Sequence, residues 1–437
     1  MREAGTNPGT NGHVTVVGAG VVGVCCALYL QREGFAVRLI DRGGIGGEAS
    51  RGNAGLISTD DCVPIGTPGV LRRVPRMLVD SLEPLTIRWR YLPQLSPWLY
   101  EFLRASRPHR VEEISTALIG PLKLAVQSYL PLLSEPESKR LITKSGVLYA
   151  YRTDAAFAAD QFGIELRRRK GVQLEVLDSD AVGRLEPVLA GKCEHGVYYP
   201  DTAFTANPYR LVRTLADRFL QAGGEYVHAE ALDIQIVDQR PVRLATTDGV
   251  YTVDRLVLAA GAWSKRLARQ LGADVPLDTE RGYIAVLPNA QCRPRMPFLA
   301  VDRHVAVTPM ETGLRVAGTV EFAGLAAGPS LKRADSLLKG VAPFLGPVDT
   351  RGAIRWMSFR PSMPDSMPVI GWAPGHTTAF FAFGHGHLGL SLAAVTGKLV
   401  AEALVGRTPS LDITPFRPER WRQNGSKPPR KAAAERS

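Results

Sequence analysis

Hydrophobic runs near the N-terminus predict a strand, a helix and a second strand in close succession. Residues 14–17 form a short apolar, β-prone run, a helical pattern extends to about Glu33, and residues 35–40 form a second apolar run. Gly34 lies just past the predicted helix, where glycine commonly ends one. This segment therefore predicts an α/β fold.

The same succession of helix and strand returns in the second half of the chain. Asn207 and Pro208 suit the N-cap and the first position of a helix with one apolar face. Strands are expected near 231–237 and 241–247, and residues 251–264 form an apolar strand that enters a small-residue turn and a helix. Because a long segment separates this part from the N-terminal unit, we predict a discontinuous domain with another domain inserted in it.

From residue 282 to 322 hydrophobic positions alternate with polar ones, which is the pattern of an antiparallel sheet. The fold class that follows is α/β, with a discontinuous Rossmann-type domain and an inserted α+β substrate domain built on an antiparallel sheet. The predicted boundaries are 13–95, 195–275 and 350–415 for the Rossmann-type domain and 96–194 and 276–349 for the inserted domain, between a disordered N-terminus (1–12) and a basic flexible tail (416–437).

A glycine-rich turn follows the first predicted strand at once. Gly18 would allow the tight turn, Gly20 would let the backbone approach a pyrophosphate, and Gly23 would let helix and strand pack closely. Asp41 ends the second strand, about 20 residues further on, where a carboxylate can bind a ribose hydroxyl. A packing turn without a ligand is the alternative, but strand, helix, second strand and acid together favour a dinucleotide site.

Two further turns are candidates for the same ligand. Residues 42–58 are rich in glycine and small polar residues, and Ser50 and Asn53 could donate to ribose and pyrophosphate, although an ordinary flexible loop has the same composition. Near the C-terminus, the turn at 384–389 links an apolar strand to a helix of small and apolar residues. A second helix N-terminus behind a glycine turn can hold an anion or a polar ring edge.

Charge and composition narrow the partners. The chain has 437 residues and a formal charge of +11, much of it in the predicted tail, so a solvated basic surface explains it better than nucleic-acid binding. Prolines, aromatics and arginines crowd residues 62–110, where contact with an anionic membrane is the alternative to ordinary core packing. The N-terminus lacks the apolar stretch of a signal peptide, and no apolar run of about 18 residues is expected to span a bilayer.

The five cysteines are odd in number and include no Cys-x-x-Cys pair, which indicates a reducing compartment without structural disulfides. Cys25 and Cys26 fall within the first predicted helix and are expected to fill the core. We find no set of residues with metal-ligand spacing.

Three parts of the sequence together resemble the D-amino acid oxidase superfamily of FAD-dependent oxidoreductases: Gly18–Gly23 with Asp41, residues 256–263, and residues 360–371 with 384–389. SRGNAGLIS (50–58), FRPSMPDSMPVIG (359–371) and GHGHLGLSLAAVTGKLVAEAL (384–404) are similar to motifs of its D-amino acid dehydrogenase group. His387 and the RGY at 281–283 resemble the D-hydroxyproline and D-proline dehydrogenases of that group.

The resemblance implies FAD, held non-covalently and extended between the glycine turns. No cysteine lies near Ser358, where related sarcosine oxidases link their flavin. The cofactor-binding residues that it implies are Gly18, Gly20, Val22, Gly23, Asp41, Arg42, Ser50, Asn53, Ala54, Gly55, Ala260, Gly261, Trp263, Gly384, His385, Gly386, His387, Leu388 and Gly389.

The resemblance also implies the chemistry, which is hydride transfer from the Cα of a D-amino acid to flavin N5, giving an imine or a 2-oxo acid. Arg360 would bind the substrate carboxylate, because a planar guanidinium suits a carboxylate bidentately. Tyr283 and His387 are the other catalytic candidates, although a histidine at a helix start is as often a cap. D-proline and cis-4-hydroxy-D-proline are the finer substrate expectations.

Alternatives remain open at this point. The chain could be an NAD-dependent dehydrogenase, a glycine- or sarcosine-type oxidase, or the FAD-binding subunit of a heteromeric amine or opine oxidase. The sequence does not decide between oxygen and a quinone or respiratory-chain acceptor, nor the oligomeric state. The expected location is the cytoplasm, with peripheral contact to the inner face of the membrane as an option.

Overall fold

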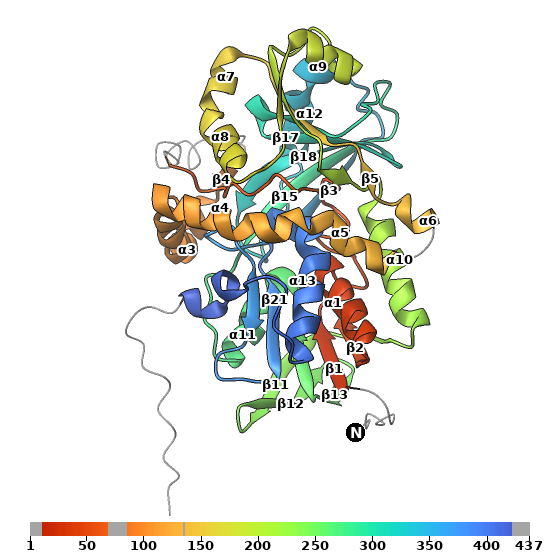
Figure 1. The fold of residues 1–437 in the computed structure, drawn as a ribbon, viewed down its shortest axis with the longest axis vertical. Helices are drawn as coiled ribbons and strands as arrows, with labels where there is room; N and C mark the ends of the chain where they lie inside the picture. Colours follow the sequence, from red (N-terminus) through yellow and green to blue (C-terminus); the bar gives the residue numbers. More distant parts are fainter. Residues whose placement is uncertain (1–10, 69–84, 134–135, 422–437) are drawn as a thin grey trace, which may run out of the picture.

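The structure is a computed structural model that describes residues 11–68, 85–133 and 136–421. Figure 1 shows two regions stacked along the long axis, each built around its own sheet, with helices between and beside them. Both regions receive strands from several separate parts of the chain.

A six-stranded sheet forms the lower region of Figure 1. Its strands, in spatial order, are β10 (Glu225–His228), β2 (Ala36–Asp41), β1 (His13–Val17), β14 (Arg255–Leu258), β21 (Ala379–Phe383) and β20 (Val369–Trp372). The first five are parallel, and β20 runs antiparallel to β21. The predicted βαβ unit and the returning αβ segment therefore meet in one Rossmann-type sheet.

Both faces of this sheet are covered, which explains its continuous apolar strands. One face carries α1 (Val21–Arg32), α10 (Pro208–Gln221) and α13 (Gly389–Leu404). The other carries α11 (Ser264–Gln270) and a small sheet of β11 (Ala231–Val237), β12 (Arg240–Thr246) and β13 (Gly249–Thr252). A Cβ on Gly397 of α13 would lie 2.7 Å from the backbone of Cys25, so the two helices touch closely, and the buried Cys25 and Cys26 fill this core as predicted.

A larger, nine-stranded sheet forms the upper region. Its main path is β19 (Ile354–Ser362), β15 (Asp278–Leu287), β18 (Gly313–Phe322), β17 (Val305–Met310), β16 (Phe298–Ala300), β6 (Val147–Tyr151), β8 (His195–Tyr199) and β7 (Glu175–Asp178), and β4 (Leu85–Ile87) pairs beside β18. Most neighbours are antiparallel, which confirms the pattern predicted for residues 282–322. Packed on this sheet are α9 (Ser179–Leu185) and α12 (Lys332–Leu345).

The remaining elements lie between the two sheets or beside the larger one. They are α3 (Leu92–Ala105), α4 (Pro108–Lys123), α5 (Ala125–Tyr129), α6 (Pro136–Lys139), α7 (Asp154–Ala159), α8 (Gln161–Arg169) and a three-stranded sheet of β3 (Leu56–Ile57), β9 (Ala203–Phe204) and β5 (Thr143–Lys144). Asn207 caps α10 as predicted, because its side-chain oxygen accepts from the N–H of Arg210 at 3.0 Å.

Strand pairing moves several predicted domain boundaries. β4, β8 and β19, which the sequence assigned to the Rossmann-type domain, pair within the larger sheet instead. Conversely, α4 and α5 were assigned to the inserted domain, yet their apolar residues join the core under α13. Two short 3₁₀ helices, Thr414–Phe416 and Pro418–Trp421, bury Phe416 and Pro418, so the basic tail does not begin at residue 416.

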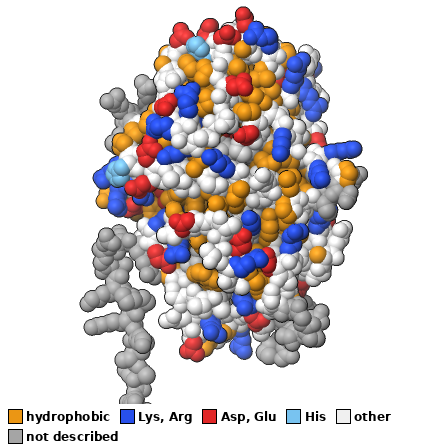
Figure 2. Space-filling view, in the orientation of Figure 1, with side chains coloured by type: hydrophobic (Ala, Val, Ile, Leu, Met, Phe, Trp, Pro, Cys, Tyr) orange, Lys and Arg blue, Asp and Glu red, His pale blue; other side chains and the backbone are white. Residues whose placement is uncertain are grey.

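The segment Gly386–Leu404 is, within the described residues, long and apolar enough to cross a membrane, which the sequence analysis did not expect. However, 78% of its most apolar window is buried inside the molecule. It is the core helix α13 with its preceding turn. On the face in Figure 2, basic side chains are interspersed with acidic ones and do not gather in one patch.

Candidate active site

A long cavity of about 710 Å³ runs from the turn after β1 to the end of β19. It brings together most of the predicted residues, namely Gly18, Gly20, Val22, Asp41, Arg42, Ser50, Asn53, Ala260, Gly261, Trp263, Arg360, His385, Gly386, His387 and Gly389. The predicted residues that do not line it are Gly23, Ala54, Gly55, Tyr283, Gly384 and Leu388.

The first end of the cavity is the glycine turn between β1 and α1. Gly18 has a φ of +110°, and a Cβ there would lie 2.3 Å from the carbonyl oxygen of Ala259. Gly20 lines the cavity with nothing closer to its Cβ position than the Ser50 hydroxyl at 3.3 Å, so the backbone is open to a ligand here. Gly23 has a packing role only, because its Cβ would lie 1.8 Å from the Gly18 carbonyl oxygen.

Asp41 fixes this turn as well as facing the cavity. Its two carboxylate oxygens accept from the N–H groups of Ala19 and Gly43, each at 2.7 Å. Burial raises the pKa of Asp41, and the two N–H bonds oppose that rise. Lone pairs remain on both oxygens, so the carboxylate can still accept from a ribose hydroxyl.

The loop after β2 wraps the same end, but its polar groups are partly used within the protein. The Ser50 hydroxyl accepts from the N–H of Val21 at 2.9 Å and so caps α1. Asn53 bonds the Ser50 carbonyl oxygen and the Gly55 N–H, which makes it a turn former at the cavity wall. The Ser50 O–H is not used by its bond to the Val21 N–H, so donation from Ser50 and Asn53 to the cofactor stays a prediction. Ala54 lies outside the cavity, and its carbonyl oxygen accepts from Thr308.

The turn after β14 supplies a third wall. Gly261 adopts a φ of +53°, and the Trp263 ring beyond it lies under the Arg42 guanidinium at 4.1 Å. The Phe359 ring makes a T-shaped contact with this indole, with 5.5 Å between the ring centroids. Arg42, Trp263 and Phe359 all line the cavity.

The C-terminal glycine turn approaches from above α13. His385 is buried and its Nε2 lies 3.0 Å from the Thr396 hydroxyl, while burial lowers its pKa to about 3. It is therefore a neutral ring that ties the turn to α13. Gly384 and Leu388 pack against the protein interior and not against the cavity. A Cβ on Gly384 would lie 2.8 Å from the Met363 side chain, and Leu388 is 1% exposed.

Arg360 marks the far end of the cavity. It lies on β19 directly opposite Glu280 of β15, and a Cβ on the neighbouring Gly282 would lie 2.5 Å from its guanidinium. Within the described residues the guanidinium has no hydrogen bond or ion pair. Burial lowers the pKa of Arg360, and Glu280 opposes that shift. The result is an unpaired cation facing a cavity.

Two features of this end were not predicted. His387 lies 3.2 Å from Asp61, a residue that no sequence motif singles out. The ring of Trp356 occupies the space where Gly52 would carry a Cβ, at 1.4 Å, so Gly52 is required for β19 to reach the loop. The His387–Asp61 pair joins two distant segments, so the only sequence signal for it is that the two side chains can carry opposite charges.

Tyr283, by contrast, is not part of the cavity. Its hydroxyl donates to Glu321 at 2.6 Å and accepts from the N–H of Ser330 at 3.0 Å, and its ring is fully buried in the core of the larger sheet. Arg281 also binds Glu321. On β15 successive side chains alternate between faces, and the face that carries Tyr283 is the interior one. The predicted catalytic role for Tyr283 is not supported by this position.

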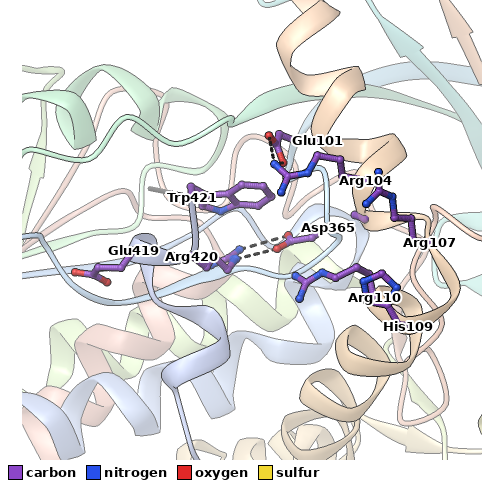
Figure 3. A pocket seen from close by; sticks show the side chains of 10 residues that line it. Glu101, Arg104, Arg107, His109, Arg110, Asp365, Glu419, Arg420 and Trp421 are labelled. Carbon is purple, nitrogen blue, oxygen red and sulfur yellow. Dashed lines mark hydrogen bonds and ion pairs between the residues drawn. The ribbon is translucent and has the colours of Figure 1, made fainter. Parts of the chain in front are cut away.

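A second cavity of about 560 Å³ lies where α3, α4 and the last described turn meet (Figure 3). Four arginines line it, and three of them are matched by acids, namely Arg104 by Glu101, Arg110 by Glu113 and Arg420 by Asp365. In the figure the Asp365–Arg420 pair lies at the centre, and Glu419 points away. Because three of the four arginines in this second cavity are already paired with acids, we do not take it as a candidate active site.

The family model described as DAO, FAD dependent oxidoreductase, matches residues 13–403. The chain belongs to this family. FAD is therefore its cofactor, and the residues fit it, because the bare glycine turn, Asp41 and the elongated cavity offer a phosphate site, a ribose acceptor and room for a long ligand. That FAD is held non-covalently stays a prediction.

Named relatives agree with this assignment. The D-amino-acid oxidase of Bradyrhizobium diazoefficiens is 39% identical, covering 94% of this chain and 99% of that one. D-amino acid dehydrogenase 2 of Mesorhizobium japonicum is 30% identical, covering 91% and 98%. The L-alpha-glycerophosphate oxidase of Mycoplasma pneumoniae, solved with FAD bound, shares the fold with a TM-score of 0.68 at 18% identity, covering 92% of this chain and 96% of that one.

Proposed function

We propose that this FAD-dependent oxidoreductase oxidises a D-amino acid at its Cα, giving an imine that hydrolyses to a 2-oxo acid. The observation that carries the proposal is Arg360, an unpaired guanidinium at the end of the cavity opposite the phosphate-binding turn. A carboxylate is the ligand that such a fork binds best. The relatives named D-amino-acid oxidase and D-amino acid dehydrogenase support the substrate class.

The roles of the side chains follow from their places. Arg360 holds the substrate carboxylate and so fixes the orientation of Cα, while Gly282 keeps the guanidinium seated by leaving space beside it. Phe359 and Leu325 give this end an apolar wall that limits water. Bound FAD supplies the two-electron acceptor that oxidation of a C–N bond requires. No base in the chain is required if the amine binds neutral.

The test is anaerobic reduction of the purified holoprotein. Mixing with D-alanine, D-proline, cis-4-hydroxy-D-proline or a panel of other D-amino acids is expected to bleach the oxidised flavin spectrum, because electrons stay on the flavin without an acceptor. The L-enantiomers serve as controls. Bleaching by no member of the D-panel would contradict the proposal, and a fast response to the two cyclic substrates alone would select the imino-acid class.

We also propose a cytoplasmic location with peripheral contact to the inner face of the membrane, where a quinone could accept the electrons. The support is a surface around α3, where Trp89 and Tyr100 are 72% and 62% exposed and Arg90 and Arg104 lie over their rings at 5.1 and 5.7 Å. Exposed aromatics beside arginines suit a lipid headgroup layer.

Sedimentation with vesicles tests this contact. Changing both Trp89 and Tyr100 to serine is expected to weaken binding to anionic vesicles by about tenfold, since two large apolar contacts are lost. Phe162→Ser is the matched control, because Phe162 is also exposed (42%) but lies on α8. No binding of the unchanged protein to anionic vesicles would refute the contact.

A further inference from the structure

A histidine that lines the reacting end of the cavity, His387, pairs with an acid behind it, and the proposed chemistry leaves this pair unused. His387 belongs to the turn before α13, and Asp61 to the loop after β3. The His387 Nε2 and the Asp61 Oδ2 are 3.2 Å apart, with side chains 29% and 24% exposed. His387 lines the cavity, and its other ring nitrogen has no partner within the described residues.

The loop that carries Asp61 is fixed by its neighbour Asp60. Asp60 is 1% exposed and accepts from the hydroxyls of Tyr149 at 3.0 Å and Thr202 at 2.5 Å. Arg167 of α8 donates to the Asp60 carbonyl oxygen at 3.2 Å. Three hydrogen bonds from three separate segments therefore fix Asp60, and with it the position of the adjacent Asp61.

Three charged groups act on the His387 ring, and two more surround its partner Asp61. Asp61 and Glu280 of β15 favour its charged form, and Arg360 of β19 disfavours it. Asp60 and Arg167 lie beside Asp61 instead: Asp60 precedes it in the chain, and Arg167 attracts both carboxylates.

The pKa of His387 is shifted in the opposite direction to that of His385, two residues away. Burial lowers the pKa of His387, but the charge of Asp61 and its hydrogen bond outweigh burial and raise it above the ordinary value. The pKa of Asp61 is lowered, because His387 and Arg167 outweigh burial. His385, whose partner is a hydroxyl, has a pKa of about 3. One turn thus holds two histidines whose pKa values are shifted in opposite directions.

We propose that Asp61 is a positioning residue that holds the His387 ring protonated and in place, so that the reacting end offers a bound anion a second cation beside Arg360. The inference rests on the proposed function only in assuming that an anionic group binds at this end. His387 is then a hydrogen-bond donor to the ligand, and Asp61 acts on the ligand through it.

The experiment compares Asp61→Asn with the unchanged holoprotein, using acetate as a carboxylate probe that cannot be oxidised at a C–N bond. Acetate affinity is read from the shift of the flavin absorbance between about pH 6 and pH 9. In the unchanged protein, affinity is expected to fall as the pH rises through the raised pKa of His387. In the variant, affinity near pH 7 is expected to be about tenfold weaker, and the fall to occur at lower pH.

Asp154→Asn is the matched control. It removes the same carboxylate from another histidine–acid pair, Asp154 with His195 at 2.6 Å, which lies outside the cavity. This variant is expected to leave the acetate curve unchanged. His387→Asn is expected to abolish the pH step, and adding Asp61→Asn to it is expected to have no further effect.

An unchanged acetate curve in flavin-loaded Asp61→Asn would overturn the proposal. If that variant lost FAD or failed to fold, ¹⁵N NMR of the histidine rings in the unchanged protein decides instead, with His387→Asn giving the assignment. Titration of His387 below its ordinary pKa would then overturn it. A D-amino acid panel that fails to bleach the flavin would sink the proposed function alone, since acetate binding is measured without turnover.

Discussion

Replacing Arg360 with alanine is expected to lower kcat/KM for the D-amino acid substrate by about 10²- to 10³-fold, mostly through a raised KM. The guanidinium lies at the end of the cavity without a protein partner, so the substrate carboxylate would lose the cation that pairs with it. Truncating one member of a desolvated charge pair costs about 2–5 kcal/mol, which is the source of this range. Steady-state kinetics with the best D-substrate of the panel gives the measurement.

Two further variants separate the carboxylate role from other effects. Arg360→Lys keeps the charge but loses the planar fork, so an intermediate KM is expected. Arg355→Ala changes another arginine of β19, one that pairs with Asp335 outside the cavity, and should leave KM unchanged. All three proteins are expected to purify with flavin. Loss of FAD in Arg360→Ala would show instead that this side chain holds the cofactor.

The sequence predicted best what is encoded locally. The turn from Gly18 to Gly23 and the carboxylate of Asp41 depend on glycine spacing and on a strand end, and the structure brings both to one cavity. The family comparison confirms the FAD chemistry that the resemblance implied. Arg360 could be singled out because it stands in a recognisable motif, although its contact with Gly282 could not.

Other parts of the site depend on contacts between distant segments, which local patterns do not encode. Tyr283 carries a suitable hydroxyl, but its side chain lies on the face of β15 that does not line the cavity. Which of the alternating residues faces the cavity depends on how β15 pairs with β18 and β19, and the local sequence does not encode this pairing. Asp61 meets His387 across more than 300 residues of chain. The prediction that β8 belongs to the Rossmann-type domain was wrong for the same reason. Its place in the larger sheet depends on pairing with β6 and β7, which lie on either side of it.

Gly23→Ala is expected to have the largest effect on the folded state. The new methyl group would lie 1.8 Å from the carbonyl oxygen of Gly18 and 3.5 Å from the Cβ of Ala259, so the first turn of α1 would have to move off β1. Neither contact is with a flexible side-chain end that could yield. We expect a loss of about 3 kcal/mol or more in the free energy of unfolding, together with loss of FAD.

Measurements on flavin-free protein can show whether Gly23→Ala is destabilised by the clash itself or only by the loss of FAD. Thermal unfolding of flavin-free protein should still show the destabilisation in Gly23→Ala, because the clash lies within the chain. Gly20→Ala meets only the Ser50 hydroxyl at 3.3 Å, and its methyl group would crowd the cavity, so weaker FAD binding with near-normal apoprotein stability is expected. Gly328→Ala, at a position with nothing within 4 Å, is the neutral control. Normal FAD binding by Gly23→Ala would contradict this prediction. It would mean that the turn after β1 tolerates a methyl group where this structure leaves no space, and that α1 and β1 do not need the close approach that the glycine fingerprint implies.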